Sequence, residues 1–267
     1  MSKKQKETVR RQFTKTADAF AKFAVRDSAP VLAEKVEFAK GQPHELVLDI
    51  ACGPGAFVLA LAPRVKFAVG LDLTPEMLRQ ARQFQAEKQV ANAAFAGADA
   101  EQVPFADASF DLVSCQHAFH HLTRPELVLG EMMRVMKPEG RLLILDPLAP
   151  ESEAKFELYN SIERLRDPSH TASLRLTTYL SLFEQRGLEI LRQSLRRRPR
   201  SFNQWMRRAG LEPRHKRYLE TRTALEESLP GDKAGFSARL EGDDIQIVHN
   251  EGMFLLGGSL PGVLSHK

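Results

Sequence analysis

Two aspartates and two glycines near the start of the chain have the types and spacing of a nucleoside-binding site. Asp49 lies near the end of the apolar run 46–50, and Gly53 and Gly55 follow it. Because glycine has no Cβ, the backbone of such a turn can pass close to a bound nucleoside-containing molecule. Asp72 ends a second apolar run, 23 residues after Asp49. A carboxylate at that place can accept both hydroxyls of a ribose.

Histidines are the candidates for proton transfer. His117, His120 and His121 follow the apolar run 110–115, and His170 lies further along the chain. Imidazole titrates near neutral pH, so a histidine is a natural general base. We expect His117 and His120 to be catalytic, although His120 or His121 could instead only pack the following turn. The side chains that we expect to form the substrate pocket are His121, His170, Phe20 and Trp205. We expect no metal site.

These residues need a scaffold, and the alternation of strands and helices over 45–147 predicts one. The predicted fold is α/β: a doubly wound, Rossmann-like, seven-stranded and mostly parallel sheet with helices on both faces. The predicted strands cover 46–50, 67–72, 94–96, 110–115, 141–145 and 188–191. The runs 244–249 and 252–258 read as further strands, and the second is expected to close the sheet as an antiparallel edge.

The rest of the chain adds to this sheet within a single domain. Residues 1–44 have helical spacing and are expected to form a cap, 45–150 the nucleoside-binding core, and 151–267 the completion of the sheet with a basic helical insertion on the substrate side. Leu129, Met132, Met133 and Met136 recur at helical spacing, which predicts core packing rather than a soft-metal site.

Composition sets the class of protein. Of the 267 residues, 43% are apolar and 27% are charged, which is ordinary for a soluble globular protein. No apolar run is long enough for a membrane span, and the polar start of the chain does not resemble a secretory signal. Cys52 and Cys115 are the only cysteines, which excludes a disulfide framework and a four-cysteine zinc site. A cytoplasmic location is the resulting expectation.

The positive charge is concentrated in one segment. The net charge is only +4, but residues 192–222 are rich in arginine and contain few acids. This asymmetry raises the question of an anionic partner, including a nucleic acid.

Four segments together resemble a known family. They are 49–55, 70–78, 100–111 and 134–141, and they stand in the order of the motifs of class I S-adenosylmethionine-dependent methyltransferases. The resemblance is to the branch that includes the ubiquinone/menaquinone-biosynthesis methyltransferases. Val58 occupies the last position of the dinucleotide fingerprint, where glycine or alanine is required, and this disfavours NAD. Phe57 departs from the small residue found in many members.

The resemblance implies S-adenosyl-L-methionine as the cofactor and S-adenosyl-L-homocysteine as the product. The residues that it assigns to the methionine end are Asp49, Ala51, Gly53, Gly55 and Gln116. The residues that it assigns to the ribose and adenine are Asp72, Leu73, Met77, Asp99 and Ala100.

The resulting hypothesis is methyl transfer to carbon or oxygen of a small, hydrophobic or aromatic metabolite. One alternative is a nucleic-acid methyltransferase that uses the 192–222 segment. The residues 114–117, Ser-Cys-Gln-His, argue against it because they lack the Asn/Asp-Pro-Pro-aromatic motif of base-amino enzymes. A second alternative is a catalytically silent partner protein that binds the cofactor. A homodimer is left open.

Overall fold

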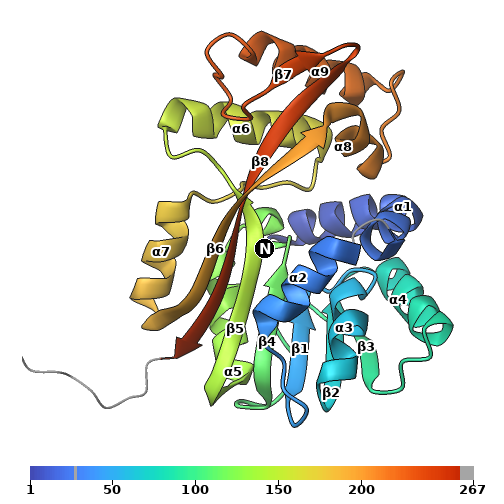
Figure 1. Cartoon of the computed structure of the whole chain (residues 1–267), viewed down its shortest axis with the longest axis vertical. Helices are drawn as coiled ribbons and strands as arrows, with labels where there is room; N and C mark the ends of the chain where they lie inside the picture. Colours follow the sequence, from blue (N-terminus) through green and yellow to red (C-terminus); the bar gives the residue numbers. More distant parts are fainter. Residues whose placement is uncertain (27–28, 259–267) are drawn as a thin grey trace, which may run out of the picture.

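An open sheet with helices on both faces forms the lower part of the molecule, and a helical layer lies above it (Figure 1). The computed structural model describes residues 1–26 and 29–258, with side chains for all of these except 19–26. The strands in this part of the chain are β1 (Leu46–Ile50), β2 (Phe67–Asp72), β3 (Ala93–Gly97), β4 (Phe110–Gln116), β5 (Met136–Leu148), β6 (Leu188–Ser201), β7 (Arg239–Glu241) and β8 (Asp244–Gly258). The helices are α1 (Lys3–Arg26), α2 (Ala29–Ala39), α3 (Ala56–Leu61), α4 (Pro75–Glu87), α5 (Pro125–Val135), α6 (Glu153–Arg166), α7 (Leu176–Gln185), α8 (Phe202–Arg208) and α9 (Lys216–Ser228), with short 3-10 turns η1 (Ala62–Arg64) and η2 (Phe119–His121).

The main sheet has the strand order β3-β2-β1-β4-β5-β8-β6, and the short β7 pairs with β8. The strands β1 to β5 pair in parallel, whereas β8 is antiparallel to both β5 and β6. The predicted Rossmann-like, mostly parallel α/β fold is thereby confirmed. One expectation was wrong: residues 244–258 form one continuous strand, and this strand lies inside the sheet, so β6 is the edge.

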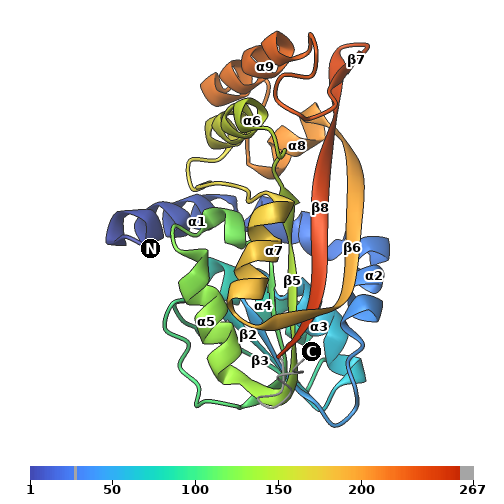
Figure 2. The same cartoon turned by 90° about the vertical axis from the view of Figure 1, so that its left-hand side faces the viewer.

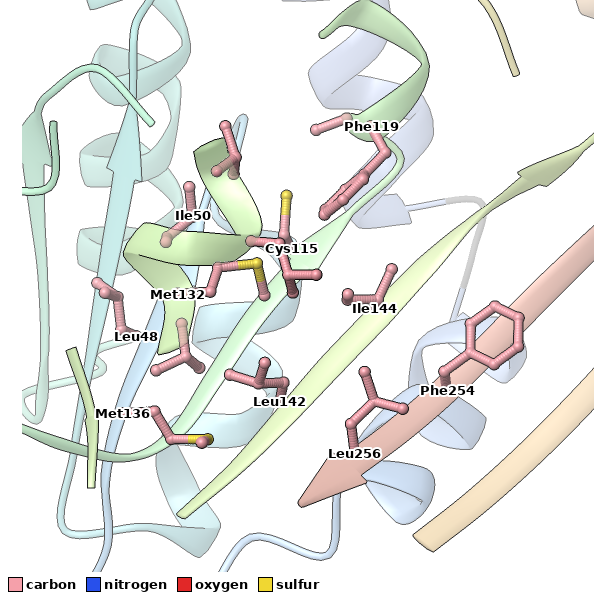
Figure 3. Packing of buried hydrophobic residues seen from close by; sticks show 14 of the residues in the cluster. Leu48, Ile50, Cys115, Phe119, Met132, Met136, Leu142, Ile144, Phe254 and Leu256 are labelled. Carbon is pink, nitrogen blue, oxygen red and sulfur yellow. The ribbon is translucent and has the colours of Figure 1, made fainter. Parts of the chain in front are cut away.

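Alternate residues of the central strands are buried on opposite faces of the sheet. Val47 and Leu143 pack with α2, α3 and α4, whereas Leu48 and Ile144 pack with α5 and α7 (Figure 2). Burial on both faces explains why these strands are continuous apolar runs. Figure 3 shows part of the second face, where Met132 of α5 lies beside the strands. Of the four residues predicted to form an apolar helical stripe, Leu129 and Met132 are core residues of α5 and Met133 is partly buried beside them, whereas Met136 is a core residue that begins β5.

The strands β6 and β8 continue above the carboxyl ends of the parallel strands and carry the upper helical layer (Figure 1). Ile245 and Ile247 of β8 form a separate apolar cluster with side chains of α6, α8 and α9, including Trp205. The basic segment 192–222 begins as strand and becomes helical at Phe202.

The N-terminal helix α1 lies across the molecule between the upper layer and the parallel sheet (Figure 1). It contacts α4 on one side and α8 on the other, and α2 packs on α3. No helix in the described part of the chain is both long enough and apolar enough to cross a membrane. The side chain of Phe20, expected in the substrate pocket, lies outside the described residues.

Candidate active site

The loop between β1 and α3 turns through the left-handed region of backbone conformation at three positions. The φ angle is 56° at Ala51, 54° at Gly53 and 74° at Gly55. Ala51 and Gly53 line a large cavity, whereas Gly55 lies behind them. A Cβ built on Gly55 would lie 2.6 Å from the ring of Phe95, so only glycine fits both the angle and the space.

Replacing Gly55 by alanine should destabilise the protein more than the same change at Gly231. Both glycines have φ of 74°, but nothing lies within 4 Å of a Cβ at Gly231. The left-handed angle costs alanine about 1–2 kcal/mol at either position, and the clash with Phe95 adds about 1–3 kcal/mol at Gly55 alone. Urea unfolding of the two variants measures this difference. Equal losses of stability would contradict the close packing beneath the loop.

Asp72 ends β2 beside this loop, and each of its carboxylate oxygens accepts a hydrogen bond from a backbone N–H. One oxygen accepts a hydrogen bond from the Gly53 N–H and the other from the Thr74 N–H, each at 2.8 Å. Burial raises the pKa of Asp72, and the hydrogen bonds from Thr74 and Gly53 counter part of this rise. Leu73 and Met77 line the cavity next to it. The carboxylate is thus fixed in place with lone pairs left for a ligand.

Asp49 is buried at the base of the cavity, 3% exposed, and lies near the charge of Lys35. Its carboxylate accepts a hydrogen bond of 2.5 Å from the Ser114 hydroxyl. Burial raises the pKa of Asp49 to about 7, although the Ser114 hydrogen bond and the charge of Lys35 oppose this rise. Burial lowers the pKa of Lys35 to about 8, against the attraction of Glu251 and Asp49. A carboxylate and an ammonium therefore share this end of the cavity.

Asp99 and Ala100 line the cavity on the side that α1 covers. Asp99 forms an ion pair with Lys6 of α1, and Lys6 also lies 2.9 Å from Glu101. The amino group of Met1 forms a further ion pair with Glu101. These ion pairs hold the start of α1 against the residues that follow β3.

Gln116 and His117 stand at the carboxyl end of β4. Both polar atoms of the Gln116 amide are buried without a hydrogen-bond partner among the described residues, although the amide lines the cavity. His117 has a φ of 51°, and its N–H donates to the Leu145 carbonyl at 2.7 Å. Burial lowers the pKa of His117 well below its ordinary value, and the nearby Lys35 and Arg200 add to this effect. His117 is accordingly a neutral imidazole at the cavity wall.

His120 has the geometry of a carboxylate-supported base. Its Nδ1 lies 2.9 Å from an oxygen of Asp146, and its backbone N–H donates to the other oxygen at 2.9 Å. The hydroxyl of Tyr179 also donates to Asp146, at 3.2 Å. Burial would lower the pKa of His120, but the charge and hydrogen bond of Asp146 outweigh it and raise the pKa above 6.5. With Nδ1 held by Asp146, Nε2 is the nitrogen left for substrate.

His121 and His170 surround His120, with ring centroids 4.2 Å and 5.4 Å from it. Each has a protein partner: His121 Nδ1 lies 3.0 Å from the Ser169 carbonyl oxygen, and His170 Nε2 lies 2.9 Å from Asn160 Oδ1. Burial lowers the pKa of His121 to about 4 and that of His170 to about 3. Within residues 1–26 and 29–258, no three His, Cys, Asp or Glu side chains are arranged to hold a metal ion.

A single cavity of about 1000 Å³ brings most of these residues together. It extends from the loop after β1 to the histidines, and then to α6, α8 and the upper ends of β6 and β8. The sequence-predicted residues that line it are Asp49, Ala51, Gly53, Asp72, Leu73, Met77, Asp99, Ala100, Gln116, His117, His120, His121, His170 and Trp205. Gly55 supports the loop from behind.

Several polar residues of the site were not predicted from the sequence. Asp146, which supports His120 but does not itself line the cavity, follows an apolar run as Asp72 does, and this signal could have marked it. His249 and Glu251 lie on the buried face of β8, where every second residue from Ile245 to Glu251 is buried. Lys35 carries no such signal, because its place depends on how α2 packs against the sheet.

The arginine-rich segment does not form one exposed basic face. Along β6 the side chains alternate, so that Arg197 is exposed whereas Arg196, Arg198 and Arg200 are partly buried. The three inward arginines pair with Glu34 and Glu251 at 2.6–3.1 Å. This arrangement does not support the nucleic-acid alternative.

Comparisons with known proteins agree with this geometry. A family model described as a methyltransferase domain matches residues 48–144. The chain is 34% identical over 201 residues to an uncharacterized methyltransferase, YcgJ, of Bacillus subtilis, a match that covers 74% of this chain and 78% of the relative. The crystal structure of the YcgJ protein has a TM-score of 0.78 at 29% identity, over 85% of this chain and 98% of that chain.

A relative with a named substrate matches over a shorter length. A demethylmenaquinone methyltransferase of Deinococcus radiodurans is 42% identical over 119 residues, which are 42% of this chain and 48% of the relative. The chain therefore spans about half the length of that relative.

Proposed function

This chain belongs to the class I S-adenosylmethionine-dependent methyltransferases, and from this premise we propose that it transfers a methyl group from S-adenosyl-L-methionine to carbon or oxygen of a small, hydrophobic or aromatic metabolite. The cavity that joins the Asp49–Asp72 end to His120 carries the proposal. At about 1000 Å³ it is at the upper end of the range for small-molecule sites, so it has room for a cofactor and an acceptor together.

The residues at the lower end of the cavity fit the cofactor. Asp72 would accept the ribose hydroxyls, and the buried carboxylate of Asp49 suits an ammonium group. Lys35 would hold a carboxylate, and the unpartnered amide of Gln116 offers both a donor and an acceptor. The side chains that would contact the adenine are Leu73, Met77, Asp99 and Ala100.

When bound, S-adenosyl-L-methionine supplies a methyl group already activated on a sulfonium. The chain then has to orient the acceptor and exclude water. His120 Nε2 would take the proton from the acceptor hydroxyl or carbon as the new bond to the methyl group forms. Asp146 would hold the ring and stabilise the resulting imidazolium, at 2.9 Å from Nδ1.

Cofactor binding should depend on pH with a maximum between about 7 and 8. Below pH 7 Asp49 takes up a proton and no longer attracts the cofactor ammonium, so the affinity falls about tenfold per pH unit. Above pH 8 Lys35 loses its proton and with it the attraction for the cofactor carboxylate. Calorimetric titration with S-adenosyl-L-homocysteine across this range measures the profile.

Two variants separate the two limbs of this profile. Asp49→Asn should remove the acidic limb and Lys35→Met the alkaline limb, each at the cost of weaker binding at the maximum. An affinity that does not change between pH 6 and pH 9 in the wild type would contradict these assignments.

The proposal itself is tested by equilibrium binding and by labelled-methyl transfer. We expect S-adenosyl-L-methionine to bind within the usual range of about 1 μM to 1 mM. Absence of binding at about 1 mM would overturn the proposal. Binding without transfer to any acceptor would favour the catalytically silent alternative instead.

A further inference from the structure

The wall of the cavity that faces the cofactor end from above carries arginines of α6 and β6. Arg166 and Arg200 both line the cavity, and their side chains are only 17% and 23% exposed. Trp205 of α8 lies beside them, with the Arg166 guanidinium 4.8 Å from its ring centroid. The strand part of this wall rises above the parallel sheet in Figure 1.

Arg200 and Arg166 have less charge compensation than Arg198. Arg198 contacts two carboxylates, Glu251 and Glu34, both at 3.1 Å. Among the described residues, the one carboxylate that Arg200 reaches is Glu251, at 2.7 Å, and Arg198 shares it. Its Nε is buried without a partner among the described residues.

Arg166 also lacks a carboxylate of its own. Its Nε donates to the Trp205 carbonyl at 3.2 Å, and Glu163 lies 3.8 Å away. The close partner of Glu163 is His249, at 2.9 Å. Because each guanidinium has five N–H donors, Arg166 and Arg200 keep donors that these contacts do not use.

The two guanidinium groups are close enough to repel each other. Burial lowers the pKa of Arg166, and Arg200 adds to this lowering although Glu163 and Asp167 oppose it. Two cations in a partly buried wall are stabilised when an anion binds between them.

We propose that Arg166 and Arg200 bind an anionic oxygen group, a carboxylate or a phosphate, on the methyl acceptor. The inference rests on the proposed function for placing the acceptor in this cavity. Guanidinium forks match both oxyanions in geometry. The acceptor is then a molecule with an apolar body and an anionic end.

The position of Arg166 and Arg200 favours a small-molecule ligand over a macromolecule. Both side chains line a cavity of about 1000 Å³, a volume within the range of small-molecule sites. The exposed Arg207 lies on the same helix as Trp205 and also lines the cavity, although the carboxylates of Glu163, Asp167 and Glu251 line it too.

The test uses the full chain and three probes of similar size: benzoate, phenyl phosphate and neutral benzamide. Each is titrated by calorimetry with and without saturating S-adenosyl-L-homocysteine. We expect at least one of the anions to bind about tenfold or more tightly than benzamide, and the stronger of the two identifies the group. Arg200→Gln and Arg166→Gln should each weaken that anion about tenfold.

The matched control is Arg197→Gln on the outward side of β6, which should leave anion binding within about twofold. The R200Q variant leaves the buried Glu251 with one partner fewer, so thermal unfolding is recorded for every variant. If R200Q does not fold, the anion affinity of R166Q tests the proposal. Equal binding of benzamide and both anions, or unchanged anion binding in folded R166Q, would overturn the proposal. A separate titration with S-adenosyl-L-homocysteine alone reports on the proposed function.

Discussion

Replacing Asp72 by alanine should weaken the binding of S-adenosyl-L-homocysteine by about 100-fold or more. The substitution removes the acceptor for the ribose hydroxyls. It also leaves the N–H groups of Gly53 and Thr74, which now donate to Asp72 at 2.8 Å, without their partner. The two hydrogen bonds from the ribose hydroxyls to the carboxylate, at about 1.5–3 kcal/mol each, account for this loss of affinity.

Calorimetric titration of the folded variant measures the effect. Asp107→Ala is the matched control, because this carboxylate is 78% exposed and pairs with Arg134 on the surface. We expect its affinity to stay within about twofold of the wild type. An Asp72→Ala protein with a normal melting temperature and undiminished affinity would contradict the cofactor assignment at the end of β2.

Replacing His120 by glutamine should lower kcat by about 10²- to 10⁴-fold with little change in cofactor affinity. The reason is loss of the base that takes the acceptor proton. Only neutral imidazole can act in this way, and Asp146 raises the pKa of His120 above 6.5. The wild-type rate should therefore rise with pH and level off once the pH exceeds the raised pKa of His120. The rate is measured with whichever acceptor the labelled-methyl screen recovers.

Two further variants separate chemistry from structure. Asp146→Asn should lower kcat and move the rising limb to lower pH, because Asp146 no longer favours the protonated ring. His121→Gln should lower the melting temperature and have only a small effect on kcat, because His121 Nδ1 is held by the Ser169 carbonyl. If His120→Gln retains kcat within about threefold, His120 is not the base.

The parallel half of the fold was predictable because its signals are local. The strands β1, β2 and β4 are short apolar runs, and each has a polar residue at or next to its last position, at the carboxyl edge of the sheet. The antiparallel half was harder. Gly252 reads as a break between two strands, yet it lies within β8, where its missing Cβ leaves room for the ring of Phe254.

The site was predictable to the extent that it follows strand ends. Asp49, Asp72 and the histidines after β4 were identified, and these residues meet at one cavity. Lys35 and Arg200 were not, because each reaches the cavity from an element whose position depends on long-range packing. Arg200 belongs to a run of arginines in which only the alternation of β6 decides which side chains face inward.

The most direct test of the account is transfer of an isotope-labelled methyl group. The full chain is incubated with labelled S-adenosyl-L-methionine and the small-molecule fraction of a bacterial extract, and the products are separated and identified by mass spectrometry. We expect a labelled metabolite with an apolar body that forms with the wild type and not with the Asp72→Ala variant. Label that stays entirely on the cofactor, or that appears only in an added RNA or protein fraction, would contradict it.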